Sequence, residues 1–189
     1  SSAASDVYKR QGLEQHVVLV DSVSKRYSMC GARIGAMVTK NAAVRKAAMK
    51  FAMARLSPPT LAQIASEAAL NTSESYFGQV RDRYAARRDA LVEGLRNIPG
   101  VTVPNPGGAF YAVCELPIDN ADAFCQWMLE HFDLDGDTVM MAPATGFYAT
   151  PGAGTRQVRI AYVLDLPMIE RAVECLRAAL GAYPGHRDA

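Results

Sequence analysis

A polar segment between two apolar runs carries the side chains best suited to chemistry. Ser22, Ser24 and Lys25 are followed, eight positions after the lysine, by Arg33. Two hydroxyls and a planar guanidinium are the donors that a phosphate monoester needs. A lysine amine beside such a phosphate could attack an aldehyde held there, once burial and nearby cations favour loss of its proton. An isolated lysine is more often a surface charge, so local chemistry alone leaves both interpretations open.

Arg159 is the second candidate for a ligand-binding side chain. It lies in the alternating segment 157–163, which predicts a strand. Its planar fork could pair with a substrate carboxylate through two parallel hydrogen bonds. A single arginine in a strand is more often a surface or ion-pair residue, and Arg156 is a nearby competitor.

Charge and cysteine usage narrow the class of protein. The 189-residue chain has a formal net charge of +1, which gives no electrostatic reason to expect nucleic acid or an anionic membrane as partner. Its four cysteines form no CxxC and its three histidines are scattered, so no metal site is expected. We expect reduced, mostly buried thiols in a cytoplasmic protein. No apolar run is long enough to predict a membrane span.

The hydrophobic pattern predicts the elements that position the lysine segment. Residues 16–20 are a continuous apolar run, which predicts a strand buried on both faces, as in a parallel sheet. Residues 33–39 predict a second strand, so the segment between them would lie where an open α/β sheet favours a ligand. Helices are predicted after Asn41, after Pro58–Pro59 and after Asn71, the last of them ending at residues 97–100.

The pattern changes after Gly100. Short strands are predicted at 101–103, 109–114, 138–141 and 157–163, and helices at 121–131 and after Asp165. The class is therefore α/β up to about residue 95 and α+β after it. Residues 1–11 have no clear apolar period, and we predict a non-native or disordered start there.

The lysine segment resembles the lysine motif of class I and II aminotransferases, the fold type I pyridoxal phosphate enzymes. Its SxSK sequence is followed by GxRxG, whose glycines let the backbone pack closely around the loop. The resemblance implies that Lys25 forms the Schiff base to pyridoxal 5'-phosphate and that Arg33 binds the cofactor phosphate. It also implies phosphate contacts from Ser22 and Ser24.

Two further segments resemble the same family, in the same order and at matching distances. Residues 157–162, QVRIAY, resemble its VRISYA strand, which implies that Arg159 binds the substrate α-carboxylate. Residues 106–111, PGGAFY, resemble the GAFY element that begins the small-domain sheet. Residues 141–148 resemble the loop that lies near the substrate. Agreement at separated places is stronger evidence than any single motif.

The resemblance runs from about residue 16 to about residue 183 and implies the C-terminal part of a fold type I enzyme. The fold class is then α/β, with the end of the large cofactor-binding domain at 12–95 and a small α+β domain at 96–189. For Phe147 and Tyr148 we predict core packing rather than catalysis. The aspartate that pairs with the cofactor's pyridine nitrogen would lie upstream, in a part that this sequence does not contain.

The implied activity is transamination between an amino acid and a 2-oxo acid by a homodimeric enzyme of amino-acid metabolism, with aspartate-type or broad specificity. Lys25 would move the proton between the substrate α-carbon and the cofactor. We expect this chain alone to be incompetent and poorly soluble, because missing strands would leave exposed edges and apolar surface.

The residues alone leave other interpretations of the function open. The same fold hosts carbon–sulfur lyases, and some transcription regulators carry an aminotransferase-like domain. A third interpretation is a non-catalytic α/β fragment with a coincidental lysine. The position of Arg159 argues against it.

Overall fold

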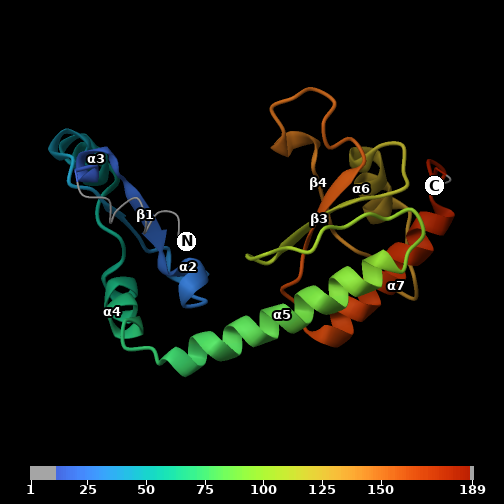
Figure 1. Cartoon of the computed structure of the whole chain (residues 1–189), viewed down its shortest axis with the longest axis horizontal. Coiled ribbons are helices and arrows are strands. Elements are labelled where there is room, and N and C mark those ends of the chain that lie inside the picture. Colours follow the sequence, from blue (N-terminus) through green and yellow to red (C-terminus); the bar gives the residue numbers. More distant parts are fainter. Residues whose placement is uncertain (1–11, 188–189) are drawn as a thin grey trace. The chain divides into compact units, whose positions relative to one another are not determined.

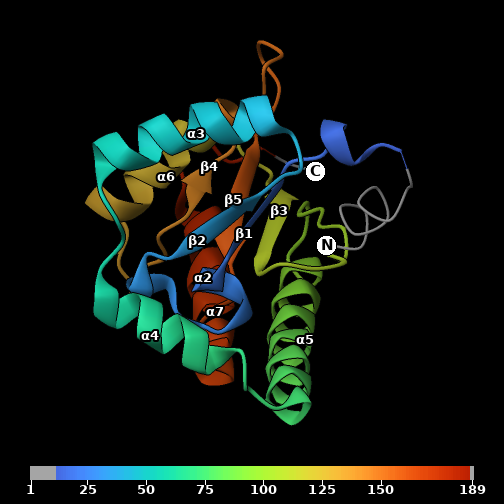
Figure 2. The same cartoon turned by 90° about the vertical axis from the view of Figure 1, so that its left-hand side faces the viewer.

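The computed structural model describes residues 12–187, so the predicted irregular start at 1–11 lies outside the described residues. The chain divides into two compact units, one ending at Glu74 and the other running from Ser75 onward. Figures 1 and 2 show the elements of both units in two orthogonal views. None of the described helices is both long enough and apolar enough to cross a membrane.

The first unit is built on a two-stranded antiparallel ribbon with helices around it. Strand β1 pairs with β2 in a register that runs from Leu19 opposite Val38 to Ser22 opposite Gly35. Figure 2 shows the two strands side by side, with α3 near one end and α4 near the other. The elements are η1 (Glu14–His16), β1 (Leu19–Ser22), α2 (Val23–Arg26), η2 (Cys30–Ala32), β2 (Gly35–Val38), α3 (Ala42–Arg55) and α4 (Thr60–Ala69).

The predicted burial of the first strand in a parallel sheet is wrong for this chain. β1 is antiparallel to its described neighbour, and Val20 is 75% exposed. Phe51 of α3 and Leu61 of α4 are similarly exposed. The apolar run correctly predicted a strand, but burial on both faces needs neighbouring layers, and the described residues of this unit provide none over Val20.

The second unit contains a three-stranded antiparallel sheet in the order β3-β5-β4. Its central strand pairs with both others, so that Arg159 of β5 lies opposite Val113 of β3 and Ala142 of β4. Figure 1 shows α5, α6 and α7 around this sheet. The elements are α5 (Glu74–Arg96), β3 (Tyr111–Glu115), α6 (Ala121–Glu130), β4 (Ala142–Pro143), η3 (Thr145–Phe147), β5 (Gln157–Ala161) and α7 (Leu166–Ala182).

Two of the predicted strands of this unit are misplaced. Residues 138–141 are not in a strand, and the pairing with β5 begins only at Ala142. The hydroxyl of Thr138 donates to the carbonyl of Met128 at 2.8 Å, which ties this stretch to the end of α6 instead. Residues 101–103 form only one isolated bridge, from Thr102 to Glu115. Apolar runs this short do not specify a pairing partner.

The main core lies in the second unit, where α5, α6 and α7 pack with the sheet. Leu95, Phe124, Val158 and Leu180 are representative members, each at most 2% exposed. Gly94 of α5 lies close to Val173 of α7 in this core.

The boundary between the two compact units lies at the start of α5, whereas the domain boundary was predicted near residue 95. Leu91, Val92 and Leu95 belong to the core of the second unit, which places most of α5 with that unit. The boundaries 12–95 and 96–189 concern the domains of a complete enzyme and stay a proposal.

Candidate functional site

The turn after β1 places the predicted phosphate-binding hydroxyls. Ser22 ends β1 and precedes the short helix α2, and its Oγ accepts a hydrogen bond from the backbone N–H of Ser24 at 3.0 Å. That bond uses a lone pair of the Ser22 hydroxyl, so its O–H remains a donor. A phosphate oxygen is a suitable acceptor for such a donor.

Arg33 has an unusual backbone conformation at the end of η2. Its φ of 54° and ψ of 39° are left-handed, and its Nη1 donates to the carbonyl of Cys30 at 3.1 Å. Gly35 lies across from β1, where an added Cβ would be 3.0 Å from the carbonyl oxygen of Asp21. The close packing predicted for the motif glycines therefore holds at Gly35. It does not hold at Gly31, where an added Cβ would have nothing within 4 Å.

A cavity of about 320 Å³ brings the predicted phosphate ligands together. Ser22, Ser24 and Arg33 all line it, and so does Arg55 from the last turn of α3. Asp21 also lines the cavity, but Arg26 forms an ion pair with its carboxylate at 2.8 Å. The lining thus offers hydroxyls, two guanidiniums and one carboxylate that already has a cationic partner, a set that suits a phosphate group.

Lys25 follows Ser24 directly but is not among the residues that line this cavity. It lies in α2 and is exposed. The described part of the first unit therefore does not bury the Lys25 side chain. Three of the four predicted cofactor ligands, Ser22, Ser24 and Arg33, therefore line one cavity. The fourth, Lys25, is next to Ser24 in the sequence.

Arg55 is a candidate ligand that the sequence did not indicate. It lies 22 positions after Arg33, in a different element, and only folding brings both to one cavity. An arginine at the end of a helix is also common for reasons of helix stability, so its residue type gives no distinguishing signal.

Arg159 and Arg156, the two candidate carboxylate ligands of the second unit, differ in their partners. Arg156 forms an ion pair with Glu115, whereas Arg159 makes no ion pair with any acidic side chain of residues 12–187. The Arg159 guanidinium carbon instead lies 4.3 Å from the ring centroid of Tyr111 and 4.7 Å from that of Phe147. A half-buried guanidinium without a carboxylate partner suits an external carboxylate.

The core-packing prediction for Phe147 and Tyr148 is wrong. Phe147 is 54% exposed and Tyr148 is 45% exposed, and the Tyr148 hydroxyl donates to Oε1 of Gln157 at 2.6 Å. Phe147 ends η3 and Tyr148 follows it, just after the edge strand β4. Nothing in the local sequence indicates that Phe147 contacts Arg159, because the contact joins two separate elements, η3 and β5.

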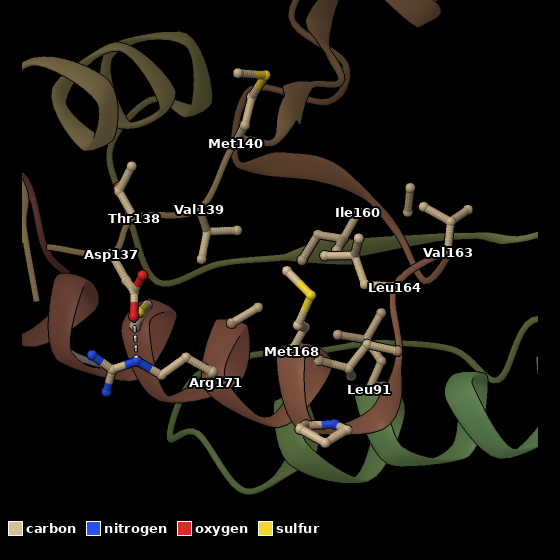
Figure 3. A pocket seen from close by; sticks show the side chains of 15 residues that line it. Leu91, Asp137, Thr138, Val139, Met140, Ile160, Val163, Leu164, Met168 and Arg171 are labelled. Atoms are coloured by element: carbon tan, nitrogen blue, oxygen red, sulfur yellow. Dashed lines mark hydrogen bonds and ion pairs between the residues drawn. The ribbon is translucent and has the colours of Figure 1, made fainter.

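An apolar cavity of about 560 Å³ in the second unit does not contain Arg159 (Figure 3). Val139, Ile160 and Met168 are among its lining residues. At its edge, Nε of Arg171 donates to Asp137 at 2.9 Å, the contact marked in Figure 3. Its charged groups are thus already paired, and the cavity presents no assembled polar set for a substrate.

Three buried thiols are poor nucleophiles. Burial raises the pKa of Cys114 to about 12 and that of Cys125 to about 11, and it also raises the pKa of Cys175. The thiolate is the reactive form, so burial keeps these groups inert near neutral pH. Cys30, by contrast, is exposed.

Comparison with known proteins identifies the class. The family described as aminotransferase class I and II matches residues 2–176, a range that includes the lysine segment and Arg159. The chain belongs to this family, whose enzymes depend on pyridoxal phosphate.

Individual relatives agree with the family. The chain is 28% identical over 180 residues to an aspartate aminotransferase of Rhizobium meliloti, covering 89% of the chain and 42% of that relative. It is 35% identical over 170 residues to an LL-diaminopimelate aminotransferase of Dehalococcoides mccartyi, covering 89% of the chain and 40% of the relative. The crystal structure of an aspartate aminotransferase from Rhizobium meliloti matches with a TM-score of 0.74 at 27% identity, over 90% of the chain and 43% of that structure. The chain therefore spans about two fifths of the length of these relatives.

Proposed function

We propose that this chain is part of an enzyme that transfers an amino group between an amino acid and a 2-oxo acid with pyridoxal phosphate. The observation that carries the proposal is the shared cavity of Ser22, Ser24 and Arg33, with Lys25 next in the chain. Bound pyridoxal phosphate would supply an aldehyde for the lysine and a ring that draws electrons from the substrate α-carbon.

The phosphate of the cofactor would be held by charge and by hydroxyl donors. Arg33 and Arg55 would supply two guanidiniums, Ser22 a hydroxyl at the end of β1, and Ser24 a hydroxyl in α2. Charge-assisted hydrogen bonds of this kind are stronger than neutral ones, so these side chains would hold the phosphate group firmly.

Lys25 and Arg159 would act on the substrate itself. The Nζ atom of Lys25, once neutral, would take a proton from the substrate α-carbon and return one during the same half-reaction. Arg159 would bind the α-carboxylate through its N–H fork and so present the α-carbon in a fixed orientation.

For the complete enzyme we propose a cytoplasmic homodimer with domains near 12–95 and 96–189 joined to an upstream part. The named relatives act on aspartate and LL-diaminopimelate, which supports an amino acid with a second polar end as substrate. We propose that the 189-residue chain alone binds parts of the cofactor and substrate but does not turn over.

The cofactor role is tested by labelling the chain with pyridoxal phosphate. Equimolar cofactor is added, borohydride fixes any lysine adduct, and peptide mapping by mass spectrometry locates it. We expect the adduct at Lys25 in preference to Lys46 and Lys50, which are exposed lysines of α3. Arg33→Gln should reduce labelling at Lys25 and leave the other two unchanged. Equal labelling of all three lysines in the unchanged chain would refute the assignment.

A further inference from the structure

Two aromatic rings from separate elements contact the side chain of Arg159. Tyr111 begins β3 and Phe147 ends η3, and their ring centroids lie 4.3 Å and 4.7 Å from the guanidinium carbon. Both distances are within the ~6 Å over which a ring attracts a cation. The strand register explains the first contact, because Tyr111 pairs with Ala161, two residues beyond Arg159 on the same face of the sheet.

The core does not account for the positions of these rings. Tyr111 is 37% exposed and Phe147 is 54% exposed, whereas the core aromatic Phe124 is fully buried. The centroid of the Phe110 ring also lies 4.5 Å from that of Tyr111, whereas Arg159 is contacted by both Tyr111 and Phe147. The cation is thus the feature that both exposed rings share.

We infer that Tyr111 and Phe147 form a clamp that positions the Arg159 guanidinium for a carboxylate, an inference that rests on the proposed role of Arg159. A ring attracts the cation through its π face and occupies none of the N–H donors in a conventional hydrogen bond. Those donors therefore stay available for a planar carboxylate. A guanidinium already held in place also loses less conformational freedom when the carboxylate binds.

The clamp explains how Arg159 is oriented although no carboxylate of residues 12–187 pairs with it. Arg156, three residues earlier in the chain, has Glu115 as its partner. Arg159 has no acidic partner among residues 12–187, so a fixed orientation must come from another source. Tyr111 and Phe147 are accordingly positioning residues, and Arg159 is the residue that touches the ligand.

The test uses the ¹⁵N-labelled 189-residue chain with pyruvate as the carboxylate probe. Ring currents should shift the Nε–H resonance of Arg159, which is identified by its loss in Arg159→Lys. We expect Phe147→Leu and Tyr111→Leu each to move this resonance towards that of a free arginine. Each should raise the dissociation constant for pyruvate about two- to fivefold. Tyr111→Phe keeps the ring and should change neither quantity.

Tyr148→Leu is the matched control, because Tyr148 adjoins Phe147 and is 45% exposed but bonds to Gln157 instead. An effect of Tyr148→Leu as large as that of Phe147→Leu would mean general loosening of the loop and would overturn the clamp. If Arg159→Lys leaves pyruvate binding unchanged, or the unchanged chain does not bind it, the carboxylate role of Arg159 fails. If Arg159→Lys weakens binding but neither leucine variant alters the resonance or the affinity, the clamp alone fails.

Discussion

Gly94 of α5 lies so close to Val173 of α7 that a Cβ atom at Gly94 would be 2.9 Å from both Cγ atoms of the valine. Valine is branched at Cβ and has little rotamer freedom in a helix, so it cannot turn away. The two helices can therefore approach to this distance only because residue 94 has no side chain. Glycine in the middle of a helix is otherwise unfavourable, which makes this contact a structural requirement.

Gly94→Ala should lower the free energy of unfolding, by about 1–2 kcal/mol, because overpacking outweighs the gain in helix propensity. Gly78→Ala in the same helix is the matched control, since its added Cβ would meet only the end of Arg81 at 3.9 Å. Gly78→Ala should raise stability by up to about 1 kcal/mol. Urea unfolding of the two variants checks the sign, and stabilisation by Gly94→Ala would contradict the close contact.

The exposed thiol is expected to react alone in the folded chain. Cys30 is exposed, whereas Cys114, Cys125 and Cys175 are buried. A disulfide reagent that releases a coloured thiol should titrate one group under native conditions and all four cysteines of the chain in denaturant. Cys30→Ser should abolish the native reaction. Rapid modification of further thiols in that variant would show that the second unit opens easily.

Stability should fall in alkaline solution because buried thiols must ionise on unfolding. The pKa of Cys114 is raised by burial from 9.0 to about 12, so the folded state retains a proton that the unfolded state loses. A raised folded pKa contributes stability that is full below pH 9 and is lost as the pH rises towards 12. The slope should be about 1.4 kcal/mol per pH unit for each such group.

Cys114→Ala separates this effect from general alkaline damage. The variant should be less stable at pH 8, because it leaves a small cavity, but its stability should fall less steeply above pH 9. Equal slopes for the variant and the unchanged chain, measured by urea unfolding at several pH values, would contradict the raised pKa of Cys114.

Local signals in the sequence predicted the helices well. Asn41 caps α3 by accepting from the N–H of Val44 at 3.0 Å, and Asp165 caps α7 by accepting from that of Met168 at 3.2 Å. Such caps depend on residues only three apart, so the sequence contains all that is needed to predict them. The family motif likewise indicated Ser22 and Arg33, although their meeting at one cavity needed the structure.

Features that depend on distant neighbours could not be predicted. The apolar run at 16–20 predicts a strand but not which layers cover it, and Val20 is exposed in the described chain. Arg55 and Phe147 join the candidate sites through folding of separate elements, and nothing in their local sequence marks them. Sequence periodicity reports how a side chain is directed along its own element, whereas contacts between elements depend on packing.

The phosphate-binding assignment predicts that the first unit binds inorganic phosphate through Arg33 and Arg55. Both guanidiniums line the same cavity, and loss of one should weaken binding by roughly 1 kcal/mol, or about fivefold. Arg45→Gln is the matched control, because Arg45 is an exposed arginine of the same helix as Arg55 and does not line the cavity. Titration calorimetry at low salt compares phosphate binding by Arg33→Gln, Arg55→Gln and Arg45→Gln. Added salt should weaken phosphate binding less in the first two variants, because each has lost a charge at the site. If Arg45→Gln weakens binding as much as Arg55→Gln, phosphate is attracted by the overall charge of α3 and the cavity is not its site.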